Sequence, residues 1–427
     1  MTPWLRYAVV IAFVATPVLA VDVKYEVALR SDVLARTPLG GDRGTTVTGD
    51  LQLAPRGQVS LGVDASTFHF LYAPTLLWRE PLQGARPDGF LPLHNARIAF
   101  DTRWPRGVFS IAEDASYGQA WVGALRNSVG SVEPITDTQS ELVPYLRSST
   151  VAGLELRPND RLTLGVSAGY QVSGSTKDLP LPPEDPAQLP PAPTLPLQYG
   201  PFALASARTT VSRLDALTTT AQVNQAHFIT GADQLVAQLR QTWDRQLSRT
   251  TLFTLGAGAA LAREELVANT LTPISGTFID LLPVAQTGLD WRDVLAGHPI
   301  RLDASLRMAP FADRITGNVY ERVELRGHGE WRFAKDWLAT AAAGGAIAVP
   351  VSLAIARPPG AATGDTQAGD RVIYGEATVV WTVKTWLLLQ ATARVLWTEQ
   401  PRTSIPGQVQ AAGTVSVTVL QQDSLAL

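Results

Sequence analysis

The sequence predicts an all-β protein, folded as a single transmembrane antiparallel up-and-down β-barrel of about 18 strands, with roughly 16 to 20 as the range. Three observations predict it. Apolar and polar residues alternate with a period of two from residue 22 to residue 420, as in strands with one wet and one apolar face. Short and long links between these stretches follow each other in turn, which is typical of transmembrane barrels. Tryptophan gathers beside the short links, because its ring suits a membrane interface.

Residues 1–20 have the pattern of a signal peptide. A single cation, Arg6, precedes a short apolar run, and the small residue Ala20 ends the segment, so we expect cleavage after Ala20. A transmembrane anchor is the alternative, but the run is too short to span a bilayer and is followed by Pro17. The barrel is then expected over residues 21–427. Its formal charge of 34 minus 38, or −4, gives no indication of nucleic-acid binding.

Along the rest of the chain, the alternation lasts longer than the strands of soluble proteins. It is clearest at 162–173, 300–308, 387–397 and 408–420. These stretches run about ten to sixteen residues, whereas strands of a soluble β-sandwich average about five or six. A tilted strand needs about nine to eleven residues to cross the hydrocarbon of a bilayer. We therefore interpret the strands as membrane-spanning.

The links divide into two classes that alternate along the chain. Tight links are predicted at 54–57, 103–106, 158–160, 214–216, 247–249, 334–335 and 383–384. Long links are predicted near 36–46, 81–92, 121–142, 175–201, 266–275, 350–369 and 399–407. Because barrels of this kind have short periplasmic turns and longer outer loops, both termini are expected on the periplasmic side. The 175–201 link contains nine prolines and should stay extended, as polyproline II does.

Six tryptophans are predicted to form an aromatic girdle on the side of the short turns. The alternative, core tryptophans scattered through a globular domain, would not follow the alternation of the links. The six are Trp104, Trp243, Trp331, Trp337, Trp381 and Trp386.

An 18-strand barrel is wide enough to enclose an aqueous channel, so function is expected inside it. The inward positions carry both signs of charge, an arrangement that suits neutral or zwitterionic polar solutes. The alternative is that these charges pair across strands and stabilise the wall. The candidates are Lys24, Glu26, Arg30, Asp32, Arg301, Asp303, Arg307, Arg322, Glu324, Arg326, His328 and Glu330.

The sequence contains no strong catalytic signal, and we expect no enzyme, no cofactor and no metal. Gly165-Val166-Ser167-Ala168-Gly169 matches the pattern of a nucleophile elbow, but it lies within an alternating strand with no helix after it. Cysteine is absent, and the five histidines have no metal-ligand spacing. A rim hydrolase that uses His94 with Asp101 and a serine of a neighbouring strand stays open.

Taken whole, the chain resembles the outer-membrane pores of Gram-negative bacteria. In size, strand number and lack of a soluble domain it is similar to the barrels that myxobacteria use to export polysaccharide. It departs from many such barrels, which end in an aromatic residue, because Gln421 and further residues follow the last predicted strand up to Leu427. The resemblance implies an integral outer-membrane protein surrounded by lipid, with a periplasmic polysaccharide-export protein as partner.

The leading functional expectation is a passive conduit for polysaccharide. The rivals are a general diffusion porin for small hydrophilic solutes, a structural sheath around a periplasmic or extracellular electron-transfer complex, and the rim hydrolase. Contacts with a periplasmic partner are expected at the short turns, where the alternative is ordinary solvated residues near lipid head groups. The turn residues considered are Arg103, Arg106, Arg157, Asp160, Arg161 and Lys335.

Overall fold

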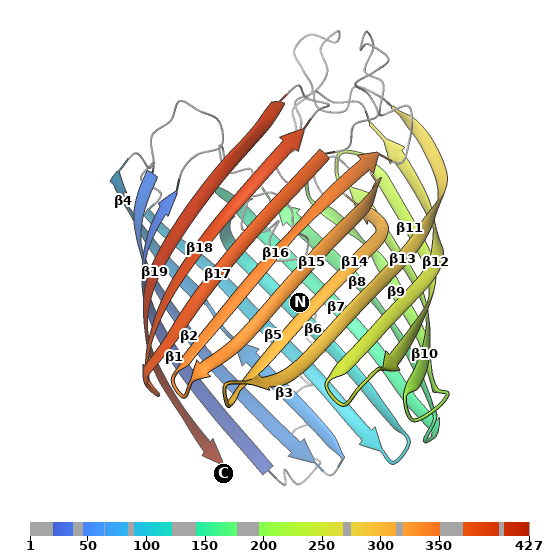
Figure 1. Cartoon of the computed structure of the whole chain (residues 1–427), viewed down its shortest axis with the longest axis horizontal. Helices are drawn as coiled ribbons and strands as arrows, with labels where there is room; N and C mark the ends of the chain where they lie inside the picture. The colour runs from blue at the N-terminus through green and yellow to red at the C-terminus, as the bar shows by residue number, and fades with distance from the viewer. Residues whose placement is uncertain are drawn as a thin grey trace, which may run out of the picture.

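The computed structural model shows one antiparallel sheet rolled into a closed barrel (Figure 1). It describes residues 20–36, 46–63, 65–83, 89–121, 142–176, 196–267, 275–312, 319–350, 370–400 and 405–426. This part of the chain contains no helix long and apolar enough to cross a membrane. The strands are β1 (Ala20–Arg36), β2 (Thr46–Val63), β3 (Ser66–Tyr72), β4 (Thr75–Gln83), β5 (Gly89–Trp104), β6 (Gly107–Trp121), β7 (Leu142–Asn159), β8 (Leu162–Ser175), β9 (Gln198–Thr210), β10 (Asp215–Phe228), β11 (Asp233–Gln246), β12 (Thr251–Leu266), β13 (Gly276–Leu295), β14 (His298–Ala312), β15 (Val319–Ala334), β16 (Trp337–Pro350), β17 (Asp370–Lys384), β18 (Leu387–Gln400) and β19 (Ile405–Ala426).

The sheet closes because β1 pairs with both β2 and β19. The 19 segments form 18 barrel strands, since β3 and β4 both lie between β2 and β5 and together make one interrupted strand. Closure gives every barrel strand a paired neighbour on both sides, which is what a bilayer requires of a spanning sheet. The predicted fold class and strand number are confirmed.

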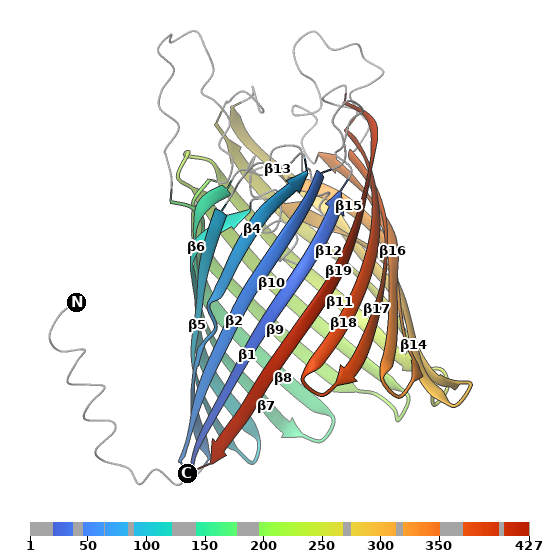
Figure 2. The same ribbon diagram turned by 90° about the vertical axis from the view of Figure 1, so that its left-hand side faces the viewer.

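The links also alternate in length. The eight links at the lower end of Figure 1, after β2, β5, β7, β9, β11, β13, β15 and β17, have two to four residues. The links at the upper end have four to 22 residues, and β1 begins and β19 ends at the lower end (Figures 1 and 2). The predicted outer loops 121–142, 175–201 and 350–369 fall mostly outside the described residues, as does the predicted leader 1–20 apart from Ala20.

One predicted tight link is wrong. Residues 54–57 continue β2, although Pro55 and Gly57 read as a turn signal in the sequence. The pairing of β2 with β4 ends at Leu53 and its pairing with β3 begins at Gly57. Pro55 therefore lies beside the interruption at 73–74, where its missing N–H removes no bond to that neighbour.

The last strand is longer than predicted. The alternation predicts a closing strand over 408–420, but β19 runs from Ile405 to Ala426. It pairs with β1 from Arg36↔Ala412 to Asp22↔Ala426. The polar residues after Leu420 thus belong to the seam that closes the barrel.

The two faces of the wall differ in polarity. On β1, Val27, Leu29 and Val33 are exposed on one face, and Arg30 and Asp32 occupy the other. The register carries the same alternation from strand to strand around the barrel. Since the lipid-facing side of a transmembrane barrel is apolar, we assign the apolar face to the outside and the polar face to the interior.

Candidate translocation channel

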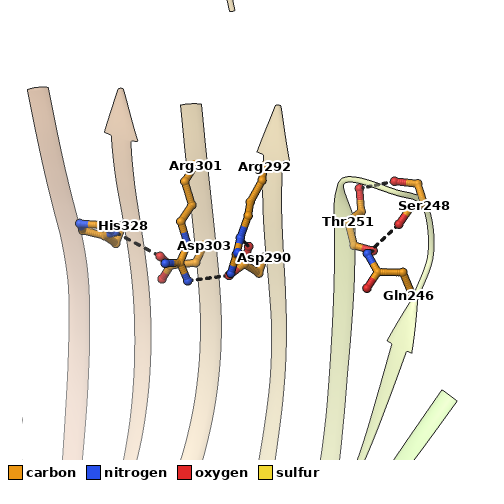
Figure 3. Close-up of polar contacts among 8 residues, drawn as sticks. All are labelled: Gln246, Ser248, Thr251, Asp290, Arg292, Arg301, Asp303 and His328. Atoms are coloured by element: carbon orange, nitrogen blue, oxygen red, sulfur yellow. Dashed lines mark hydrogen bonds and ion pairs between the residues drawn. The ribbon is translucent and has the colours of Figure 1, made fainter. Parts of the chain in front are cut away.

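A hydrogen-bonded cluster of charges lies on the polar face of β13 and β14, near their short turn (Figure 3). Asp290 lies between two guanidinium groups: its Oδ1 accepts from Arg292 Nε at 2.9 Å, and its Oδ2 accepts from Arg301 Nη2 at 2.6 Å. On the next strands, Asp303 Oδ1 contacts His328 Nδ1 at 3.1 Å. Asp290 thus has two cationic partners and Asp303 has an imidazole beside it, so the charges of this wall partly offset one another and the electric field inside the barrel is lower.

A second cluster lies where the sheet closes. Arg30 contacts Asp32 at 2.7 Å on its own strand and donates to Ser416 Oγ of β19 at 3.1 Å. Arg79 of β4 binds Asp50 of β2 through two hydrogen bonds of 2.8 and 2.6 Å, and both side chains are largely buried. Such bidentate pairing fixes the geometry of both side chains.

All twelve predicted channel residues occupy the face opposite the exposed apolar residues, on β1, β14 and β15. The structure brings those of β14 and β15 together and separates them from those of β1. Further ion pairs also join close neighbours, Lys24 with Asp22 at 3.0 Å and Arg322 with Glu324 at 3.6 Å. These pairs therefore run along the wall, as the alternative of wall stabilisation expects.

The tip of the β14–β15 hairpin turns into the barrel. Pairing between β13 and β14 ends at Ala285↔Met308, whereas β14 and β15 stay paired as far as Ala312↔Val319. Beyond that point Ala309 packs on the inner positions Ala260 of β12 and Val284 of β13, and all three are buried.

A hydrogen bond holds this tip in place. The Val319 N–H donates to Glu264 Oε2 of β12 at 2.6 Å, although two strands lie between β12 and β15. Val319 is 0% exposed and Glu264 is 2% exposed. The β14–β15 tip thus covers part of the inner wall at the end with the long links. No sequence pattern predicts this contact, because it joins residues 55 positions apart.

The hydrolase pairing left open above is wrong. His94 lies on the apolar face, where its Nδ1 contacts the Tyr72 hydroxyl at 2.7 Å. Asp101 lies on the opposite face and contacts His69 Nε2 at 3.4 Å, and His69 Nδ1 contacts Ser60 Oγ at 2.9 Å. In serine hydrolases the serine bonds Nε2 and the acid bonds Nδ1, so this chain has the reverse arrangement. The described residues hold no group of three or more metal-ligating side chains.

Five of the six predicted girdle tryptophans lie near the short-turn ends of their strands, and Trp386 lies in the short link between β17 and β18. The rings of Trp337 and Trp381 stack at 5.1 Å, and Phe333 links Trp337 to Trp331. Trp243 Nε1 donates to Asp215 Oδ1 at 3.1 Å, so its polar edge has a partner. Their role at the lipid interface stays a prediction.

Comparison with known proteins gives one family and several structures. The sequence profile of the EpsX exopolysaccharide export family matches residues 115–425. No curated protein sequence matches the chain.

The solved structures that the chain resembles include OpdO of Pseudomonas aeruginosa, with 12% identity, a TM-score of 0.47, and coverage of 95% of this chain and 98% of that one. OccK2 (OpdF) of the same species shares 11% identity with a TM-score of 0.46, over 94% of this chain and 98% of the other. A BenF-like porin from Pseudomonas fluorescens Pf-5 shares 9% identity with a TM-score of 0.47, over 93% of this chain and 99% of the porin.

Proposed function

The chain belongs to the EpsX exopolysaccharide export family, and from this premise we propose that its barrel carries polysaccharide to the cell surface with a periplasmic polysaccharide-export protein as partner. It is an integral β-barrel of the bacterial outer membrane. The family match carries the proposal, because it spans the wall from β6 to β19 and is not confined to one motif.

The interior supports passage of a polymer without chemistry. An 18-strand closure leaves room for an aqueous channel. We propose that the charged residues of β1, β14 and β15 line this conduit. Because many of them are paired with immediate neighbours, they present hydrogen-bonding groups to a passing chain without one dominant charge that would hold it. We propose no reaction in the barrel.

The inward β14–β15 tip supports a conduit that is regulated at its outer end. A general diffusion porin needs a permanently open path, whereas a polymer exporter must keep small solutes from leaking between rounds of export. A periplasmic partner would engage the opposite end, where the short turns lie.

Deleting the gene in a strain that produces surface polysaccharide tests the proposal. We expect loss of at least one surface polysaccharide, with recovery when the gene is restored, as measured by carbohydrate staining of intact cells. A deletion strain that displays all its surface polysaccharides at normal levels would contradict it.

Conductance separates the exporter from a diffusion porin. The purified barrel in a planar bilayer should conduct little by itself and more when its periplasmic partner is added. A large and steady conductance by the barrel alone identifies a porin.

A further inference from the structure

A hollow in the inner wall lies close to the short turns of β5 to β9. Its volume is about 610 Å³, within the usual range of small-molecule pockets. The polar side chains that line it come from five adjacent strands and all occupy the polar face: Arg103, Ser110, Glu155, Arg157, Ser167 and Ser206.

The hollow exists because two positions of the wall, Gly153 and Gly165, have glycine and therefore no side chain. Gly153 lies directly between Ser110 and Ser167 in the register, and Gly165 is paired with Ser206. A Cβ at Gly165 would lie 2.8 Å from Ser206 Oγ, and one at Gly153 would lie 3.2 Å from Ser110 Oγ. Any larger residue at these two glycines would therefore fill the space and crowd the serine hydroxyls.

The chemistry of the lining suits an acidic sugar. Three serine hydroxyls can exchange hydrogen bonds with sugar hydroxyls, and Val108 and Leu204 offer apolar surface to the C–H face of a ring. Arg157 pairs with Glu155 at 2.8 Å, whereas Arg103 has no carboxylate partner among the residues that the structure describes. The hollow therefore keeps one surplus positive charge, carried by a guanidinium group that matches a carboxylate in geometry.

The nearby rim strengthens this charge. Arg106, Arg161, Arg213 and Arg249 occupy the short links after β5, β7, β9 and β11, are exposed, and have no ion pair within the described ranges. We call these four residues the arginine crescent. The links after β5, β9 and β11 carry arginine and no acid, whereas the link after β7 carries Asp160 beside Arg161. The links on the other half of the rim lack this excess, because they read Ala-Gly, Lys-Asp and Thr-Trp at 296–297, 335–336 and 385–386. A one-sided cationic rim raises the local concentration of an anionic polymer beside the hollow.

We propose that the hollow binds a carboxylated sugar residue of an acidic polysaccharide, with Arg103 as the carboxylate anchor and the serines as partners of the ring hydroxyls. The proposal rests on the export function above and specifies its substrate class. The arginine crescent delivers the polymer from the periplasm, and the hollow is its first binding station on the inner wall.

Calorimetric titration of the full-length barrel in lipid nanodiscs tests the site, with tetragalacturonate as the acidic probe and maltotetraose as the neutral one. We expect tetragalacturonate to bind at least about tenfold more tightly, because one charge-assisted hydrogen-bonded pair is worth about a factor of ten. Arg103→Gln should lower the affinity for tetragalacturonate about tenfold and leave the affinity for maltotetraose unchanged. Gly165→Val should abolish binding of both by filling the hollow.

Lys384→Gln is the matched control, because it removes a cation at the short-turn end of β17, on the other half of the rim. It should leave both affinities as in the unmodified barrel. Equal affinity for the two probes, or an equal loss with Lys384→Gln and Arg103→Gln, would overturn the proposal. Each variant's fold is checked by its heat-dependent shift in gel electrophoresis. If the deletion strain lacks surface polysaccharide but the purified barrel does not bind tetragalacturonate, this binding site is refuted and the proposed export function still stands.

Discussion

Glu113 is a carboxylate on the lipid-facing side of the wall. It lies in the middle of β6 on the same face as the exposed residues Ile111 and Tyr117. Ser148 Oγ of β7 donates to it at 2.5 Å, and the Thr150 hydroxyl donates to its other oxygen. Two donors satisfy the carboxylate, but the group still lies against hydrocarbon, where ionisable side chains are costly.

Replacing this carboxylate with an apolar residue should stabilise the barrel. We expect Glu113→Leu to raise the free energy of unfolding by about 1 kcal/mol, because charged groups on the lipid face destabilise transmembrane barrels by up to a few kcal/mol. Urea titration in lipid vesicles, followed by tryptophan fluorescence, measures the change.

Asp114→Leu is the control, since Asp114 is the next residue, points to the opposite face and lies 3.6 Å from Arg97. This variant should not raise the free energy of unfolding. Equal stability of Glu113→Leu and the unmodified chain would show that the hydroxyl donors already offset the cost of the carboxylate.

Most residues could be assigned to a face from the sequence alone, because a period of two is a local property. The charges of β1, β14 and β15 occupy one face in the register, as their alternation predicts. Glu113 breaks the alternation, and its serine and threonine partners are more than 30 residues away. The contacts of His69 and His94 could likewise not be predicted from the sequence, since each depends on which strands become neighbours.

At the level of elements, the inward β14–β15 tip contacts β12 through the hydrogen bond from Val319 to Glu264 and the packing of Ala309 on Ala260. Its bond to Glu264 uses a carboxylate acceptor, and such bonds contribute about 1.5–3 kcal/mol. Removing the acceptor should release the tip from β12.

We expect Glu264→Ala to increase the frequency of channel openings in a planar bilayer at least about tenfold, since a loss of about 1.4 kcal/mol already shifts the populations by that factor. Glu264→Gln keeps an acceptor oxygen at the same position, so this variant should open about as often as the unmodified channel. If both variants behave like the unmodified channel, the tip does not control conduction.

The number of strands and the alternation of links could be predicted because turn residues and the period of a strand can both be recognised within a short stretch of sequence. The prediction of a link at 54–57 shows the limit, since Pro55 and Gly57 have the composition of a turn but lie beside an interruption in the next strand. The tip depends on the contact between Glu264 and Val319, which only the closed barrel brings together.

For the whole molecule, closure depends on the seam between β1 and β19, which contains 15 paired positions. Six of these, from Val27↔Gln421 to Asp22↔Ala426, use residues after Leu420. Removing them would leave part of β1 with unpaired backbone groups at the edge of the sheet, where lipid offers no hydrogen-bond partner.

A chain that ends at Leu420 should therefore assemble poorly. We expect a several-fold decrease in the folded, heat-modifiable form recovered from outer membranes, as measured by electrophoresis with and without boiling. A chain that lacks only Leu427 should assemble normally. Normal assembly of the chain ending at Leu420 would mean that nine seam pairs, 15 minus six, are sufficient.

The same seam sets the order of events during biogenesis. Synthesis and export proceed from the N-terminus, so β1 emerges first, yet one of its two partners is the last strand to appear. Contacts between the two ends of a chain are slow to form, and they leave the early strands open to aggregation meanwhile. One edge of β1 therefore stays unpaired until β19 arrives, and the barrel can close only after its C-terminal strand has been exported.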